Sequence, residues 1–193
     1  MTYIISRYNQ DVEWVKEYTD DYVIYDRSKE PVPGSVVVPN IGSDIYDKFS
    51  YIIEHYSDLP AVAVFTKANL FKYITKEEFE KVKDNTVFTP LLTQNHETDG
   101  VINFYRDGLY YAINNYWYLG AHPAKWGKQI RDFFKMDERE YNGFAPGSNY
   151  ILTRENILKH PKIVYEELRS YLEWSVYPGD AQMMERNLYY LWS

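Results

Sequence analysis

The sequence contains no cysteine in 193 residues, which excludes disulfide bonds and thiolate metal sites. No apolar run approaches the roughly 18 residues of a membrane span, and the start lacks the basic flank and cleavage site of a secretory signal. The formal net charge of −7 argues against a general nucleic-acid-binding protein, which would normally present a basic face. These absences predict a cytoplasmic protein without a membrane span.

Aromatic side chains are abundant. Tyr alone supplies 21 residues, beside 9 Phe and 5 Trp, and tyrosine combines a flat apolar face with a polar tip. Such rings either fill a core or stack on sugars and bases, and composition leaves both interpretations open. Apolar residues are 45% and charged residues 25%, close to the globular average. We therefore expect one globular domain over residues 1–193.

Short apolar runs alternate with helical patterns through the first half of the chain. Apolar residues recur at helical spacing between Ile45 and Tyr56, and Asn9 is expected to cap an earlier helix. The alternation predicts an α/β fold with a mostly parallel central sheet and flanking helices. The strands are expected at residues 3–5, 22–25, 35–38 and 61–65.

The second half has fewer strand patterns. Residues 84–125 predict irregular structure with short strands around the turn residues Asp107 and Gly108. This half is expected to add a mixed edge to the sheet and a helical flank. Its further elements are a helix over 127–136, a strand over 150–152, a helix from Pro161 to about Trp174 and a last helix from Asp180.

Polar residues collect where the predicted strands end. Ligands of an open α/β sheet bind outside the carboxyl ends of its strands, so these residues predict one small-molecule site. Arginine offers phosphate a bidentate fork, tyrosine stacks on a base, and glycine admits close backbone approach. The residues are Arg7, Tyr8, Asn9, Asp26, Arg27, Asn40, Gly42, Asp44, Lys67 and Asn69, with a further stretch from Phe144 to Ile157.

Some of these residues also have purely structural interpretations. Asn9 and Asp44 could cap helices, Arg7 could pair with a surface carboxylate, and Lys67 could be an ordinary surface lysine. In the binding interpretation, the helix that follows Gly42 points its N–H groups at an anion, and Asp44 accepts hydrogen bonds from ribose or sugar hydroxyls.

Several motifs resemble an uncharacterised family of glycosyltransferase-like proteins. Residues 7–14 match its R-Y-N-x-D-x-x-W pattern, residues 39–42 match P-N-x-G, and residues 185–192 match E-R-x-x-x-x-x-W. Residues 40–45 are also similar to the N-x-G-x-D-I stretch of rhamnan-synthesis-type glycosyltransferases. The resemblance implies a single-domain glycosyltransferase-A-like, Rossmann-like fold, with a nucleotide-sugar-binding half at about 1–83 and an acceptor-binding half at about 84–193.

The resemblance also implies a reaction. A hexose or deoxyhexose would pass from a nucleoside diphosphate sugar to a hydroxyl acceptor, with the residues at the strand ends holding the donor. Glu185 is the first candidate for catalytic base and Asp180 the second, although a structural ion pair of Glu185 with Arg186 or Arg154 is equally allowed. The acceptor is a glycan, a protein or a hydroxymethylated base of viral DNA, bound on the aromatic and cationic segment 116–135.

The chain departs from many such enzymes at the expected metal site. They carry Asp-x-Asp after the fourth strand to hold a divalent cation on the donor diphosphate, whereas residues 66–69 here read Thr-Lys-Ala-Asn. Either Lys67, helped by Arg7 or Arg27, neutralises the diphosphate, or other acids such as Asp26 and Asp44 hold Mn²⁺ or Mg²⁺. The four histidines show no metal-ligand spacing.

Two other functions fit parts of the sequence. A non-catalytic carbohydrate-binding module would use the many aromatic residues, but it leaves the α/β alternation and the basic strand ends unexplained. A glycoside hydrolase would need paired carboxylates, for which Asp180 and Glu185 are candidates.

Overall fold

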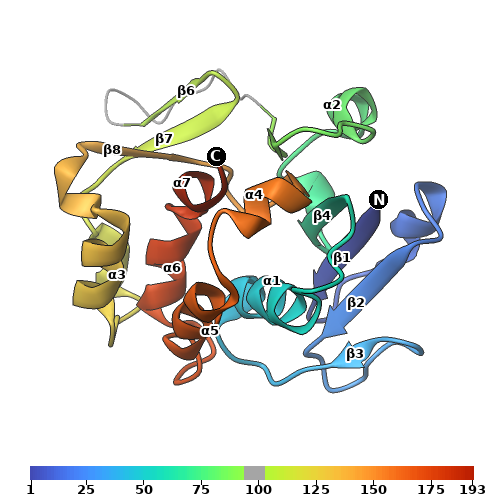
Figure 1. Cartoon of the computed structure of the whole chain (residues 1–193), viewed down its shortest axis with the longest axis horizontal. Coiled ribbons are helices and arrows are strands. Elements are labelled where there is room, and N and C mark those ends of the chain that lie inside the picture. Colours follow the sequence, from blue (N-terminus) through green and yellow to red (C-terminus); the bar gives the residue numbers. More distant parts are fainter. Residues whose placement is uncertain (94–102) are drawn as a thin grey trace.

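A six-stranded sheet forms the centre of the molecule (Figure 1), in a computed structural model that describes residues 1–93 and 103–193. Its order is β3-β2-β1-β4-β9-β5; the first four run parallel, and β9 is antiparallel to both its neighbours. The predicted α/β class with a mostly parallel sheet is confirmed. The strands are β1 (Thr2–Arg7), β2 (Tyr22–Asp26), β3 (Val36–Val37), β4 (Val62–Lys67), β5 (Thr89–Pro90) and β9 (Tyr150–Thr153).

The strand order reverses beside β1. The chain places β2 and β3 on one side of β1, then crosses back through helix α1 (Ser43–Glu54) to place β4 on the other side. Ser6 lies opposite Lys67 in the β1–β4 ladder, so the carboxyl ends of these strands are neighbours. Open α/β sheets bind their ligands at such a reversal.

Helices cover both faces of the sheet. Successive residues of a strand point to opposite faces, so each apolar strand contributes side chains to both layers. Ile4 and Phe65 pack with α1 and the C-terminal helices, whereas Ile5 and Val64 pack with residues of the smaller helices. The larger layer holds α4 (Arg154–Leu158), α5 (Lys162–Ser170), α6 (Gly179–Glu185) and α7 (Leu188–Trp192). The smaller layer holds the 3₁₀ helices η1 (Glu13–Glu17) and η2 (Leu70–Lys72) with α2 (Lys76–Val82).

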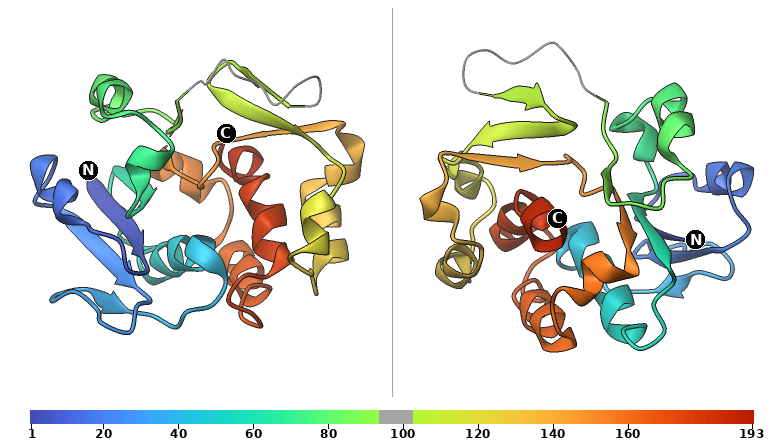
Figure 2. Two further views of the ribbon diagram at one scale, coloured as in Figure 1. Left: turned by 180° about the vertical axis from the view of Figure 1, so that it is seen from behind. Right: turned by 45° about the horizontal axis from the view of Figure 1, so that its top comes forward.

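A second, antiparallel sheet of three strands lies beyond α6 and α7, as the two views in Figure 2 show. Asp107 and Gly108 join β6 to β7 with φ of +50° and +76°, which is typical of a two-residue hairpin turn. The predicted short strands around this turn are confirmed, although residues 94–102 lie outside the described residues. This part contains β6 (Phe104–Arg106), β7 (Leu109–Ile113), β8 (Tyr141–Phe144), η3 (Trp117–Gly120), α3 (Gly127–Phe134) and η4 (Met136–Glu138).

Three local predictions are wrong. Asn9 caps no helix, because η1 begins only at Glu13, whose N–H donates to Asp11. The helix predicted to reach Trp174 ends at Ser170. The last helix divides into α6 and α7, since the Asn187 side chain donates at 2.7 Å to the Met183 carbonyl that a continuing helix would need.

The two predicted halves of the chain share one sheet. β9 belongs to the second half, yet it lies between β4 and β5 and pairs with both. Over residues 1–93 and 103–193, no helix combines the length and the apolar character needed to span a bilayer.

Candidate functional site

A small pocket of about 170 Å³ lies at the carboxyl ends of β1, β2 and β4, below the roughly 300–1,000 Å³ that is usual for small-molecule sites. Most of the predicted binding residues line it, namely Arg7, Tyr8, Arg27, Asn40, Asp44, Lys67 and Asn69. The other lining residues were not predicted from the sequence; they are Ser6, Gln10, Ser43, Tyr73 and Tyr177. The strand ends therefore form one site.

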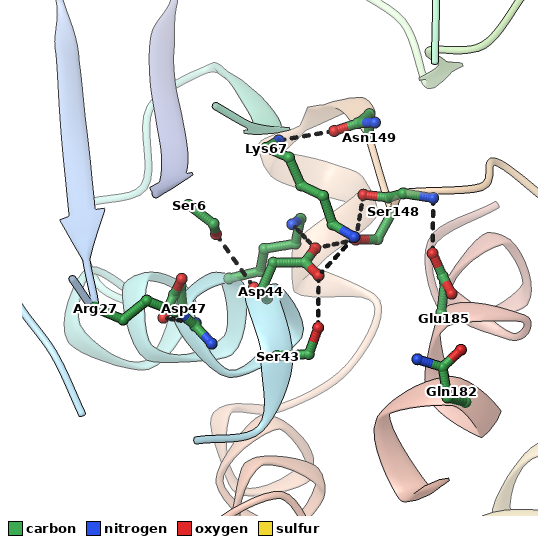
Figure 3. A network of polar contacts seen from close by, with 12 residues as sticks. Ser6, Arg27, Ser43, Asp44, Asp47, Lys67, Ser148, Asn149, Gln182 and Glu185 are labelled. Carbon is green, nitrogen blue, oxygen red and sulfur yellow. Dashed lines mark hydrogen bonds and ion pairs between the residues drawn. The ribbon is translucent and has the colours of Figure 1, made fainter. Parts of the chain in front are cut away.

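Asp44 lies at the centre of a buried polar network beneath this pocket (Figure 3). Its Oδ2 is 2.5 Å from the Lys48 Nζ, and its Oδ1 is 3.2 Å from the Lys67 Nζ. Ser43 donates a hydrogen bond to Oδ1 at 2.9 Å, and Ser148 donates to Oδ2. Burial would raise the pKa of Asp44, but the two ammonium groups hold it well below its usual range.

The two lysines around Asp44 differ in their surroundings. Lys48 is fully buried one helical turn after Asp44, and burial lowers its pKa even though Asp44 opposes this effect. Lys67 is the last residue of β4 and lines the pocket, with its side chain 24% exposed. Burial would lower the pKa of Lys67, but the carboxylates of Asp44 and Glu185 raise it. Lys67 is therefore a cation at neutral pH.

Each arginine of the pocket is held by a fully buried aspartate. Arg7 Nη1 lies 2.6 Å from Asp26 Oδ2, and the two residues are direct partners in the β1–β2 ladder. Arg27 Nη2 contacts Asp47 at 2.5 Å without the alignment of a hydrogen bond. Burial raises the pKa of Asp47 to about 6, against the opposing effect of Arg27. The aspartates thus fix where the guanidinium groups lie.

Asp26, predicted as a donor-binding residue, is not part of the pocket lining. Its side chain is fully buried and also accepts hydrogen bonds from the backbone N–H groups of Ser28 and Val32. Asn9 is exposed and does not line the pocket either. Asp26 therefore contributes to the site through Arg7.

Gly42 also lies outside the pocket lining, and it has a packing role. It adopts φ +66°, and a Cβ at this position would lie 2.8 Å from the Cβ atoms of Leu172 and Tyr46. The Gly42 N–H donates to the Ser175 carbonyl at 2.8 Å. The Ser43 N–H donates to the carbonyl of residue 176 at 3.2 Å. The amides of Gly42 and Ser43 are therefore occupied by protein carbonyls and are not available to an anion.

The loop between β8 and β9 joins the parts of the site. Gly147 N–H donates to Glu185 Oε1 at 2.7 Å, Ser148 donates to Asp44, and the Asn149 side chain accepts the backbone N–H of Lys67 at 2.8 Å. Ser148 adopts φ +56°, a strained conformation for a non-glycine residue. The stretch from residue 144 to 157 predicted a contribution to the site, but no sequence signal identified these pairings.

The two candidate bases have different environments. The Glu185 side chain is 17% exposed, and its Oε2 lies 4.0 Å from the Arg186 guanidinium. Asp180 is fully buried, and its oxygens accept hydrogen bonds from the backbone of Lys125 and Trp126 and from the Trp174 ring. Asp180 therefore holds α3 and the segment before α6 together and has no role in the pocket.

The segment 116–135, predicted as the acceptor platform, has much of its charge compensated. Lys128 pairs with Asp132 at 2.6 Å, and Arg131 lies 3.8 Å from the carboxylate of residue 137. Trp126 stacks on Tyr171 with ring centroids 5.2 Å apart. Lys125 and Lys135 are exposed, so two of the four cations of this face remain available to a phosphate backbone.

The acids considered for a divalent cation do not fit that role. Asp26 and Asp44 each pair with a cationic side chain, and their oxygens also accept N–H or O–H donors. A hard cation normally needs carboxylate oxygens for itself. Within residues 1–93 and 103–193, no three His, Asp or Glu side chains gather as a metal-binding group.

One comparison with known proteins gives a match. A family model described as "Protein of unknown function (DUF3431)" matches residues 3–193. No curated protein and no solved structure matches the chain. The family description names no activity, so the likeness to glycosyltransferases rests on the motifs quoted above. Because the match spans nearly the whole sequence, the chain belongs to the DUF3431 family.

Proposed function

We propose that the chain is a glycosyltransferase that moves a hexosyl or deoxyhexosyl group from a nucleoside diphosphate sugar to a hydroxyl acceptor. The main support is the pocket at the strand reversal, where Arg7, Arg27 and Lys67 bring cationic side chains from three strand ends. A diphosphate supplies the negative charge and the acceptor oxygens that such side chains bind. The resemblance of the motifs to glycosyltransferases supports a sugar on this diphosphate, and it also implies a glycosyltransferase-A-like fold.

Lys67 would stabilise the leaving group. When the bond between the anomeric carbon and the diphosphate breaks, the diphosphate keeps the electron pair and gains negative charge. A fixed ammonium group near that charge lowers the barrier, since it needs no reorganisation during the reaction. Asp44 and Asn149 hold Lys67 by its side chain and its backbone, which supports such a fixed position.

The other lining residues would orient the donor. The Tyr8 ring is 39% exposed and lines the pocket, so it is available to stack on the base. Asn40 and Asn69 offer amide groups for hydroxyls of the ribose or the sugar. Neither Asp26 nor Asp44 is free for that purpose, because each carboxylate is already paired.

Glu185 is the proposed base. The acceptor oxygen would attack the anomeric carbon, the bond to diphosphate would break, and the hydroxyl proton would pass to the Glu185 carboxylate. Gly147 holds one carboxylate oxygen, and the charge of Glu185 acts on Lys67. Glu185 is not among the residues that line the pocket. Asp180 is not proposed as the base because both its oxygens already accept hydrogen bonds. The glycoside hydrolase interpretation needed Asp180 as the second of two carboxylates, so it is not supported.

The same site would bind its donor without a divalent cation, with Lys67 in place of the metal. A carbohydrate-binding module would use the exposed tyrosines of the pocket but gives the three cationic side chains no role. Thermal unfolding with and without ligand separates these functions, because a ligand that binds the folded state raises Tm.

The test is a thermal-shift panel of free hexoses and of uridine, guanosine, adenosine and thymidine diphosphates, each with EDTA and with Mn²⁺. We expect at least one diphosphate to raise Tm in EDTA. Stabilisation by free sugar alone, with no response to any nucleoside diphosphate, would overturn the proposal in favour of a lectin. A response that requires Mn²⁺ would overturn only the metal-free binding.

A further inference from the structure

Three apolar side chains lie exposed beside the pocket, on the segment between α5 and α6. Trp174 is 40% exposed, Val176 37% and Tyr177 56%. Tyr177 also lines the pocket, so this surface continues directly from the proposed donor site. We call residues 174–177 the ledge.

The backbone of the ledge is fixed to the start of α1. The carbonyl of Ser175 accepts the Gly42 N–H at 2.8 Å, and that of Val176 accepts the Ser43 N–H at 3.2 Å. Asp44, the centre of the pocket network, is the next residue of the helix. The ledge and the pocket are therefore held on the same turn of α1.

A second set of contacts fixes the other side of the ledge. The Trp174 indole N–H donates to the buried carboxylate of Asp180 at 2.9 Å, and the Gly179 N–H donates to the Pro123 carbonyl at 2.9 Å. A Cβ at Gly179 would lie 1.9 Å from the carbonyl oxygen of His122, so this contact is close. The Trp174 ring, held in this way, loses little freedom when it binds a partner.

We propose that the ledge binds the acceptor and that the acceptor is a glycan; this inference rests on the proposed glycosyl transfer. Flat rings with polar edges pack on the apolar face of a sugar while the hydroxyls stay at the rim. Because Tyr177 belongs to both surfaces, a sugar on the ledge lies next to the donor pocket. An acceptor hydroxyl would then reach the transferred sugar without leaving the surface.

Charge argues against a nucleic-acid acceptor. Residues 173–180 read Glu-Trp-Ser-Val-Tyr-Pro-Gly-Asp, with no cation, an exposed acid at Glu173 and the buried Asp180. Binding to a phosphate backbone depends on Lys and Arg side chains. In segment 125–135, Lys128 and Arg131 are paired with or close to acids, whereas Lys125 and Lys135 are exposed.

Size argues against a folded protein as the acceptor. A standard protein interface covers about 800 Å² on each partner and 20–30 residues a side. The ledge offers only three exposed apolar side chains, which suit one or two sugar rings better.

The test measures glycan and nucleotide binding separately. The intact chain is applied to a printed oligosaccharide array that also carries unglycosylated peptides, and hits are titrated by isothermal calorimetry. The variants are Tyr177→Ser and Trp174→Ser, which remove rings, and Trp174→Phe, which keeps a ring without the bond to Asp180. Ile163→Ser, at a 63% exposed position on α5, is the control, and Trp117→Ser tests the 116–135 segment.

We expect the wild type to bind at least one oligosaccharide, with a loss of at least tenfold in Tyr177→Ser and little change in Trp174→Phe and Ile163→Ser. If Trp174→Ser fails to fold, Tyr177→Ser decides alone. Four results would each overturn the proposal that the ledge binds a glycan. They are no glycan binding, binding to peptides alone, unchanged affinity in Tyr177→Ser, and a larger loss of affinity in Trp117→Ser than in Tyr177→Ser. If nucleoside diphosphates still raise Tm in that case, the proposed function stands.

Discussion

The Lys67 ammonium group lies 3.2 Å from the Asp44 carboxylate, and this ion pair joins the end of β4 to the first turn of α1. Asp44 also holds the fully buried Lys48, so one carboxylate is shared between a lysine of the core and a lysine of the pocket. Substitutions of Asp44, Lys48 and Lys67 should therefore separate effects on folding stability from effects on ligand binding.

Lys67→Met should weaken the binding of a nucleoside diphosphate roughly 10- to 100-fold, since a hydrogen bond to a charged group contributes about 1.5–3 kcal/mol. Asp44 keeps Lys48 as a partner, so the fold should remain intact. Isothermal calorimetry measures the affinity. Lys81→Met, at an exposed lysine of α2, is the control. Equal affinity in the wild type and Lys67→Met would show that Lys67 does not bind the diphosphate.

Asp44→Asn should cost about 3–5 kcal/mol of stability, because it leaves the Lys48 ammonium buried without its carboxylate. Urea unfolding measures the loss. Adding Lys48→Met should restore most of it, since both charges are then absent. A double variant as unstable as Asp44→Asn would assign the loss to the hydrogen bonds from Ser43 and Ser148 instead.

Gly42→Ala should destabilise the chain more than Gly34→Ala does. Both glycines have positive φ, +66° and +81°, so each change costs about 1–2 kcal/mol of backbone strain. Only at Gly42 would the added Cβ overlap Leu172 and Tyr46, which adds about 1–3 kcal/mol. Urea unfolding of the two variants compares them directly. Equal losses would mean that the overlap relaxes without cost.

Stability should fall between about pH 10 and pH 12. Burial raises the pKa of Tyr3, Tyr51 and Tyr118 from 10.0 to about 12. The unfolded chain therefore loses these protons first, so stability is complete below pH 10 and is lost as the pH rises through the folded values. Urea midpoints and phenolate absorbance against pH test this. Full phenolate absorbance near pH 10 in a folded chain would contradict it.

Glu185→Gln should leave donor binding unchanged and slow sugar transfer by at least about 100-fold, the range of general-base catalysis. The amide oxygen of Gln can still accept the Gly147 N–H, so the loop should keep its position. Single-turnover rates with a labelled donor measure the effect, with Glu166→Gln on α5 as control. Transfer at the wild-type rate would show that another group takes the proton.

The sequence predicted most of the sheet and the location of the pocket. Buried parallel strands must be apolar on both faces, so runs such as residues 3–5 and 61–65 stand out. The polar residues directly after them then had to meet at one edge of the sheet. Asp26 could not be separated from the lining residues in this way, because its burial depends on the register that sets it opposite Arg7.

The contacts around Asp44 and Lys67 were beyond prediction from local patterns. Ser148 meets Asp44 across 104 residues of sequence, and Asn149 meets Lys67 across 82. No short motif encodes such a pairing, because it depends on how β9 enters the sheet. The pairing of the Gly42 and Ser43 amides with the carbonyls of residues 175 and 176 was beyond prediction for the same reason.

The place of β9 has a consequence for biosynthesis. A ribosome that has released the chain only as far as residue 140 has delivered β1 to β4 but not β9, the strand that pairs with the far side of β4. That edge stays open on the nascent chain, and open edges recruit other strands. Completion of the sheet therefore waits until β9 has been made, and the loop that carries Ser148 and Asn149 arrives with it.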